Sequence, residues 1–142
     1  MNRRAMLLLS VFLLLAVGGV YRFSHPMGWS RELVSLLDHA EHISGRVVWR
    51  VQQAELSERQ AERVAEVIRG AKLQDNPSFA GTTEEGSFEL IVDGVRVSAG
   101  FSVDTELQYS WNGERRSIRA VSDGYAQALR EIARETIPEI PG

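Results

Sequence analysis

Three histidines are the first residues of this 142-residue sequence whose type and spacing suggest chemistry. His39 and His42 are three residues apart, so a helix through both would place them on neighbouring positions of one face. Asp38 and Glu41 stand beside them, and His25 precedes them in the sequence. A metal ion needs three or four converging ligands, which makes His39 and His42 candidate metal ligands. We favour the alternative, in which these histidines interact with carbonyl groups at a helix C-terminus, and we expect no cofactor.

Aromatic and arginine residues near the end of the sequence form the candidate binding surface. Its members are Tyr109, Trp111, Arg115, Arg116 and Arg119. Side chains of these types contribute much of the binding energy in protein interfaces. Because side chains alternate along a strand, Tyr109 and Trp111 share one face with Leu107. If that face is the core face, the two aromatic residues are packing residues, and this alternative stays open.

Two acidic pairs, Glu84 with Glu85 and Asp104 with Glu106, have the composition that general acid–base catalysis uses. Both pairs fall in predicted loops or turns, where carboxylates are usually solvated. The segment 74–86 is the longest one without a predicted element, and it is either a binding loop or a connector. The sequence has no cysteine, no Gly-x-Ser-x-Gly motif, no zinc-protease motif and no glycine-rich phosphate loop. These features favour a binding protein and leave a hydrolase or a metal-dependent enzyme as the alternative.

The first 22 residues differ from the rest of the chain. Arg3 and Arg4 precede an uncharged run over residues 5–21, and a helix over this run would be roughly 25 Å long, close to the thickness of the bilayer core. We predict a single-pass cell-membrane anchor with a cytoplasmic N-terminus, because arginines stay on the cytoplasmic side. The alternative is a signal peptide, cleaved after the small residues of the 16–18 segment, and a secreted domain. The expected organisation is an anchor or signal peptide over 1–22, a linker over 23–29 and one extracytoplasmic domain over 30–142.

The charge balance limits the expected partners. The chain has 16 basic and 19 acidic residues, a formal net charge of −3. Arg3, Arg4 and Arg22 belong to the N-terminal segment, so the remainder has 13 basic and 19 acidic residues, or −6. A nucleic acid is therefore not an expected partner, whereas the membrane and a protein are. Because the sequence contains no cysteine, the domain must be stabilised by an ordinary hydrophobic core.

Periodicity and turn residues predict the order of the elements. Helices are expected over 31–41 with Ser30 as N-cap, after the capping box Ser57–Gln60, and from Ser122 or Asp123 to Pro138. A strand is expected over 43–52. Two hairpins follow, with two-residue turns at Asp93–Gly94 and Asn112–Gly113.

The predicted fold class is α+β. We expect an antiparallel sheet of about five strands, formed by one N-terminal strand and two hairpins, packed against two or three helices and preceded by one hydrophobic helix. This layout resembles that of small exported bacterial domains tethered by one N-terminal segment. The expected role is a protein-interaction or regulatory module. A small-ligand-binding domain is a further alternative, for which Gly100 would leave room beside the sheet.

Overall fold

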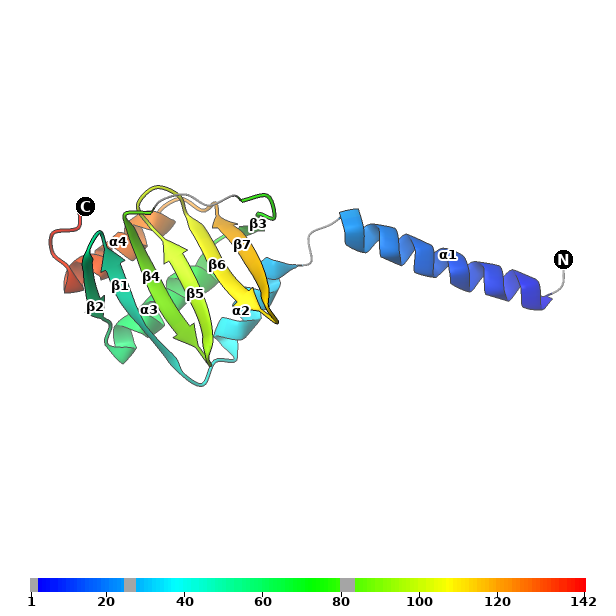
Figure 1. The fold of residues 1–142 in the computed structure, drawn as a ribbon, viewed down its shortest axis with the longest axis horizontal. Helices are drawn as coiled ribbons and strands as arrows, with labels where there is room; N and C mark the ends of the chain where they lie inside the picture. The colour runs from blue at the N-terminus through cyan, green and yellow to red at the C-terminus, as the bar shows by residue number, and fades with distance from the viewer. Residues whose placement is uncertain (1–2, 25–27, 80–83) are drawn as a thin grey trace.

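The computed structural model describes residues 3–24, 28–79 and 84–142, and it has the predicted α+β class. Figure 1 shows one antiparallel sheet with helices behind it. The helices are α1 (Arg3–Ser24), α2 (Trp29–Asp38), α3 (Glu58–Gly70) and α4 (Tyr125–Thr136). The strands are β1 (Ile43–Trp49), β2 (Gln52–Glu55), β3 (Leu73–Asp75), β4 (Gly86–Val92), β5 (Val95–Gly100), β6 (Glu106–Trp111) and β7 (Glu114–Ala120).

The centre of the sheet consists of the two predicted hairpins. The strand order is β2-β1-β4-β5-β6-β7-β3, and every pairing is antiparallel. Asp93 and Gly94 have φ values of 47° and 83°, and Asn112 and Gly113 have φ values of 51° and 79°. Positive φ at both loop residues is the type I′ geometry that matches the twist of the strands, so both predicted turns are confirmed.

The prediction of about five strands is too low, because β2 and β3 add one strand at each edge. The strand expected over 43–52 ends at Trp49, and the chain reverses at Arg50 and returns as β2. Arg50 has a φ of 54° although it is not a glycine. Its N–H donates to the Glu85 carbonyl oxygen over 2.7 Å, and its guanidinium lies 5.3 Å from the Trp49 ring. These contacts stabilise a turn that the residue types do not signal.

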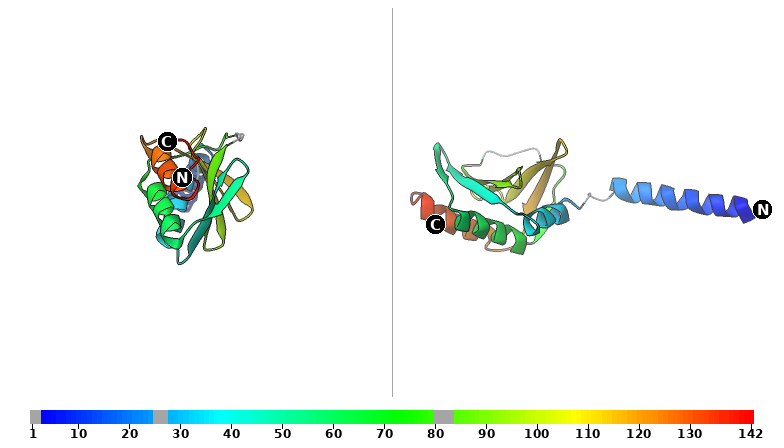
Figure 2. Two further views of the ribbon diagram at one scale, coloured as in Figure 1. Left: turned by 90° about the vertical axis from the view of Figure 1, so that its left-hand side faces the viewer. Right: turned by 90° about the horizontal axis from the view of Figure 1, so that it is seen from below.

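Helices α2, α3 and α4 cover one face of the sheet, and the other face has no helix over it among the described residues (Figure 2). The capping box is confirmed, since Ser57 Oγ accepts from the Gln60 N–H and Gln60 Oε1 accepts from the Ser57 N–H. The other two helix starts were predicted wrongly. Helices α2 and α4 begin after Gly28 and Gly124, whose φ values are 68° and 80°, and neither start has a capping side chain from the residue before it.

The core lies between the helices and the sheet. Its fully buried large side chains include Leu33, Leu37, Val64, Ile68, Phe88, Leu90, Phe101, Leu107, Ile118 and Leu129. Phe101 contacts Phe88 and Trp49 with ring centroids 5.4 and 6.3 Å away. Gly86 is required beside these rings, because a Cβ there would lie 2.5 Å from Phe101 and 2.6 Å from Trp49. Burial of this set supplies the main stabilisation of the domain.

Helix α1 presents apolar side chains that no other element covers. The exposed fractions of its large apolar residues from Met6 to Leu13 range from 49% to 71%. Figure 1 shows α1 apart from the layers of sheet and helices. Within residues 3–24, 28–79 and 84–142, no helix meets the combined requirements of length and apolar character for crossing a bilayer.

Candidate functional site

The helix-free face of the sheet, here called the open face, is organised in rows of side chains that run across the strands. The middle row is Glu55, Arg46, Glu89, Ser98, Gln108 and Ser117, from β2 to β7. Arg46 donates through Nε to Glu89 Oε2 over 2.7 Å and through Nη1 to Gln53 Oε1 over 3.0 Å. Polar side chains therefore dominate this face, in contrast to the apolar face under the helices.

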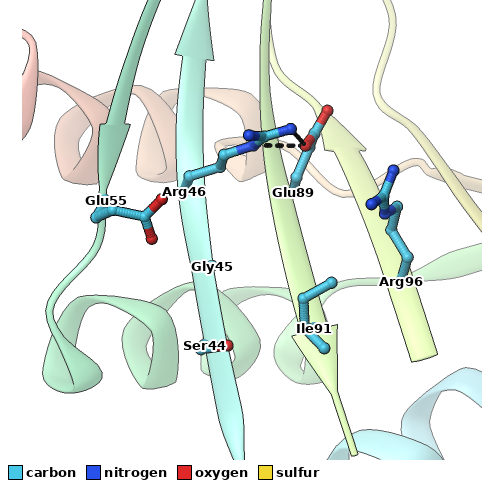
Figure 3. Close-up of a pocket in the computed structure, with 7 residues that line it drawn as sticks. All are labelled: Ser44, Gly45, Arg46, Glu55, Glu89, Ile91 and Arg96. Carbon is cyan, nitrogen blue, oxygen red and sulfur yellow. Dashed lines mark hydrogen bonds and ion pairs between the residues drawn. The ribbon is translucent and has the colours of Figure 1, made fainter. Parts of the chain in front are cut away.

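A shallow hollow of about 240 Å³ lies on the open face over β1, β4 and β5. Figure 3 shows the Arg46–Glu89 ion pair on its floor, with Glu55 on one side and Arg96 on the other. Neither the Glu55 side chain nor the Arg96 side chain forms a hydrogen bond or an ion pair with any described residue. The hollow thus has one unpaired charge of each sign at opposite rims.

A second row places two arginines on the same line across the sheet. Ser44 is opposite Ile91, Ile91 is opposite Arg96, and Ser110 is opposite Arg115. The register between β5 and β6, continued by one residue, brings Arg96 opposite Ser110. Arg96 and Arg115 are then separated by two strand spacings, roughly 10 Å. The Arg115 side chain, like that of Arg96, is exposed and has no hydrogen-bond or ion-pair partner among the described residues.

The predicted aromatic–arginine cluster is divided between the two faces of the sheet. Arg115 and Arg119 lie on the open face, whereas Tyr109 and Arg116 point toward the helices. The Tyr109 hydroxyl lies 2.8 Å from Glu32 Oε1 and 2.9 Å from the Trp29 carbonyl oxygen. Trp111 is half-buried at the border of the core.

Glu32 joins Tyr109 to Arg116 beneath α2. Arg116 Nη1 donates to Glu32 Oε2 over 3.0 Å. Burial, followed by the hydrogen bond to Glu32, raises the pKa of Tyr109 above its usual range. Tyr109 therefore remains a neutral phenol that holds α2 on the sheet.

Asp75 caps the first turn of α2 from the edge strand β3, a contact that the sequence does not reveal. Its carboxylate accepts from the Trp29 N–H over 3.1 Å, from the Ser30 N–H over 2.8 Å and from the Ser30 hydroxyl over 2.6 Å. Ser30 was predicted to be the N-cap, but it lies inside the helix and donates to a carboxylate 45 residues away. A negative charge at this position also interacts favourably with the helix dipole.

The two acidic pairs found in the sequence meet at one end of the open face. Glu84 accepts from the N–H groups of Ser102, Val103 and Asp104 and from the Ser102 hydroxyl. Gly100 provides the space for this side chain, since a Cβ there would lie 2.7 Å from Glu84 Oε1. The room beside Gly100 that the sequence suggested for a ligand is therefore occupied by Glu84.

Glu106 is the buried member of this acidic group. Only 7% of its surface is exposed, Asn76 Nδ2 donates to its Oε1 over 2.8 Å, and its Oε2 has no hydrogen-bond partner among the described residues. Burial raises the pKa of Glu106, with a smaller contribution from Asp104, while Asn76 opposes the shift. The 74–86 segment, of which 80–83 lie outside the described residues, thus provides Asn76 and Glu84 as contacts to the sheet.

The histidines do not share a helix. Helix α2 ends at Asp38, so the spacing argument for His39 and His42 does not hold. His39 is the C-cap residue, with Nδ1 2.9 Å from the Ser35 carbonyl oxygen, while the His42 N–H donates to Asp93. His25 lies outside the described residues. Across the part of the chain that the structure describes, no three side chains of the metal-binding types are grouped to hold an ion.

The open face is therefore the candidate site. Within the described part of the chain, it combines an uncovered polar surface, a hollow with unpaired charges and two unpaired arginine side chains in one row. Such a surface can pair with carboxylates and accept hydrogen-bonding groups, and arginine is well suited to planar, bidentate recognition of carboxylates. Comparison of the chain with protein-family models, with curated proteins and with solved structures gave no match.

Proposed function

We propose that this chain is a membrane-tethered, extracytoplasmic domain that binds a partner protein through the open face of its sheet. The observation that carries the proposal is the row containing Arg96, Ser110 and Arg115. Its two arginine side chains face solvent without a partner among the described residues, on a surface that no described helix covers. Arginine is among the residues most often responsible for binding energy in protein interfaces.

Charge complementarity favours a partner segment that carries carboxylates. The domain after the N-terminal segment has a formal charge of −6, yet the row with Arg96 and Arg115 contains no acidic residue. Salt screens the overall repulsion beyond about 8 Å, whereas a carboxylate in contact with an arginine is screened much less. Contact between an acidic segment and this row is therefore electrostatically favourable, although the domain as a whole is acidic.

The exposed apolar side chains of α1 support the tether. An apolar surface of this extent on one helix is rarely left in water, and Arg3 and Arg4 at its start fit the cytoplasmic end of an anchor. A protein held at the membrane in this way presents its open face to partners within a limited distance of the bilayer. The alternative of a cleaved leader would release the same binding face into solution.

Site-specific photo-crosslinking in membranes tests the proposal. A crosslinking amino acid at Ser110 should capture one discrete partner, while the same group at Gln127, exposed on α4, should not. The double variant Arg96→Glu/Arg115→Glu should reduce the yield by about tenfold or more, and the control Arg59→Glu on α3 should leave it unchanged. Equal yields from Ser110 and Gln127, or full yield from the double variant, would contradict the proposal.

The hollow favours a second candidate function, the binding of a small zwitterionic ligand. Glu55 and Arg96 provide one unpaired charge of each sign across about 240 Å³. Such a ligand would raise the melting temperature of the protein, and Glu55→Gln would weaken this effect. Zwitterionic amino acids screened by thermal shift distinguish this candidate from a protein partner.

A further inference from the structure

A second surface feature lies on the opposite layer of the molecule, beside the start of α2. A groove of about 390 Å³ runs between α2 and the segment from Ala71 to Leu73. Its apolar lining comes from Val34, Ala71 and Leu73, and Arg31 and Ser30 lie at the end where α2 begins. The groove is separate from the open face, because the helices cover the other side of the sheet.

The groove lies close to α1 along the chain. Only five residue steps separate Ser24, the last residue of α1, from Trp29, the first residue of α2. Five steps span at most about 17 Å even when fully extended. If α1 is in the bilayer, as the proposed function holds, the Arg31 end of the groove must lie at or near the headgroups.

One positive charge at the end of this groove is unpaired. The Arg31 side chain is exposed and has no hydrogen-bond or ion-pair partner among the described residues. Lys72 does not line the groove: it alternates with Leu73 and so lies on the side of β3 that carries Gln74, which is opposite Arg119 of the open face. The acidic lining residue, Asp38, lies 3.8 Å from Arg69 Nε. The end of the groove where α2 begins therefore offers an uncompensated cation.

We propose that the groove between α2 and β3 seats the domain on the bilayer, with Arg31 pairing with an anionic lipid headgroup and Val34 entering the interface. Apolar side chains beside a basic residue are the composition that interfacial protein segments use. This inference rests on the tether of the proposed function. It fixes the orientation of the domain, because one end of the helical layer faces the lipid while the open face remains available to a partner.

The natural absence of cysteine permits a direct test with single labels. Spin labels are attached to Val34→Cys in the groove, to Val51→Cys at the 97% exposed turn between β1 and β2, and to Phe12→Cys in α1. The full chain is reconstituted in vesicles of phosphatidylcholine with phosphatidylglycerol, and in phosphatidylcholine alone. Collision rates with oxygen and with a water-soluble nickel complex report whether each label is in lipid or in water.

We expect the Val34 and Phe12 labels to favour oxygen and the Val51 label to favour nickel in anionic vesicles. Arg31→Gln should lower the ratio of seated to unseated domain about fivefold, corresponding to about 1 kcal/mol per cation near an anionic surface, and the control Lys72→Gln, on the other side of β3, should lower it less. A Val34 label as aqueous as the Val51 label, with the Phe12 label in lipid, overturns the seating and leaves the tether intact. An aqueous Phe12 label overturns both.

Two further results would also contradict the seating. A Val34 label that favours oxygen equally in phosphatidylcholine alone, without sensitivity to Arg31→Gln, would rule out recognition of anionic headgroups. Spin–spin broadening between Val34 labels would assign the groove to a second copy of the chain instead.

Discussion

Replacing Asp75 by asparagine tests whether an edge strand holds the first turn of α2. In the native protein both carboxylate oxygens are used, one by the Trp29 N–H and the other by the Ser30 N–H and hydroxyl. In Asp75→Asn the amide oxygen can serve Ser30, but the amide nitrogen then faces the Trp29 N–H, which is also a donor. The variant therefore loses one acceptor and the charge with almost no change in volume.

The expected loss is about 2 kcal/mol. Removing a helix N-cap costs ~0.5–2 kcal/mol, and removing a favourable charge from a helix N-terminus costs ~0.3–1 kcal/mol. In a domain of this size, slightly above 100 residues, each kcal/mol lowers the melting temperature by roughly 4 °C. The variant should therefore melt about 8 °C below the native protein.

Thermal unfolding of the full chain in detergent, followed by tryptophan fluorescence, measures this difference, since the buried Trp49 reports on the core. The matched control is Asp123→Asn, because Asp123 is exposed and has no hydrogen-bond or ion-pair partner among the described residues. Ser30→Ala, which removes only the hydroxyl donor, should have a melting temperature between those of Asp75→Asn and Asp123→Asn. If Asp75→Asn melts at the same temperature as the Asp123→Asn control, the Asp75 carboxylate does not hold the helix and the reasoning is refuted.

Three further predictions concern the carboxylates and Gly100. Because burial raises the pKa of Glu106, the protonated carboxyl stabilises the folded state, and this stabilisation should be lost as the pH rises through the folded-state pKa. In urea unfolding, Glu106→Gln should remove that part of the pH dependence. A difference in unfolding free energy between the native protein and the variant that stays constant across pH would contradict this. The pKa of Asp93 is shifted in the opposite direction, since backbone N–H groups of His42 and Glu41 lower it. An NMR titration should place this pKa below the ordinary value for aspartate, and the stabilisation by the ionised carboxylate should be lost as the pH falls through it. Gly100→Ala should displace the Glu84 carboxylate from the 102–104 amides and destabilise the protein by about 1–3 kcal/mol. When Gly100→Ala is combined with Glu84→Gln, the losses of unfolding free energy in urea should be less than additive. Full additivity would show that the space beside Gly100 is not reserved for Glu84.

Local signals in the sequence predicted the centre of the fold. The Asp93–Gly94 and Asn112–Gly113 turns and the Ser57–Gln60 capping box depend on residues that are neighbours in the chain. The edges of the sheet were missed because they depend on distant contacts. Arg50 takes positive φ through a bond to Glu85, and Leu73 pairs with Ala120. Neither contact leaves a pattern in a single sequence.

The candidate site was predictable only in its residue types. The expected cluster included Arg115, and its position on the open face follows from strand alternation. Its alignment with Arg96 required the register across three strands, and the sequence offered no reason to select Arg96. Glu84 and Glu106 were noticed as members of acidic pairs, but their proximity depends on the contacts of Asn76 with Glu106 and of Glu84 with Asp104, which join residues far apart in the chain.

The position of α3 between the two edge strands has a consequence for how the chain acquires its structure as it leaves the ribosome or a translocation channel. Strand β1 needs β4 as its inner neighbour and β3 needs β7, so these N-terminal strands emerge before the strands with which they pair. The β4–β7 meander, by contrast, needs only chain-adjacent strands for its own pairings. Vectorial emergence therefore delays docking of the β1 edge until β4 is free and docking of the β3 edge until β7 is free. The apolar side of α3 must wait for the sheet surface that buries it.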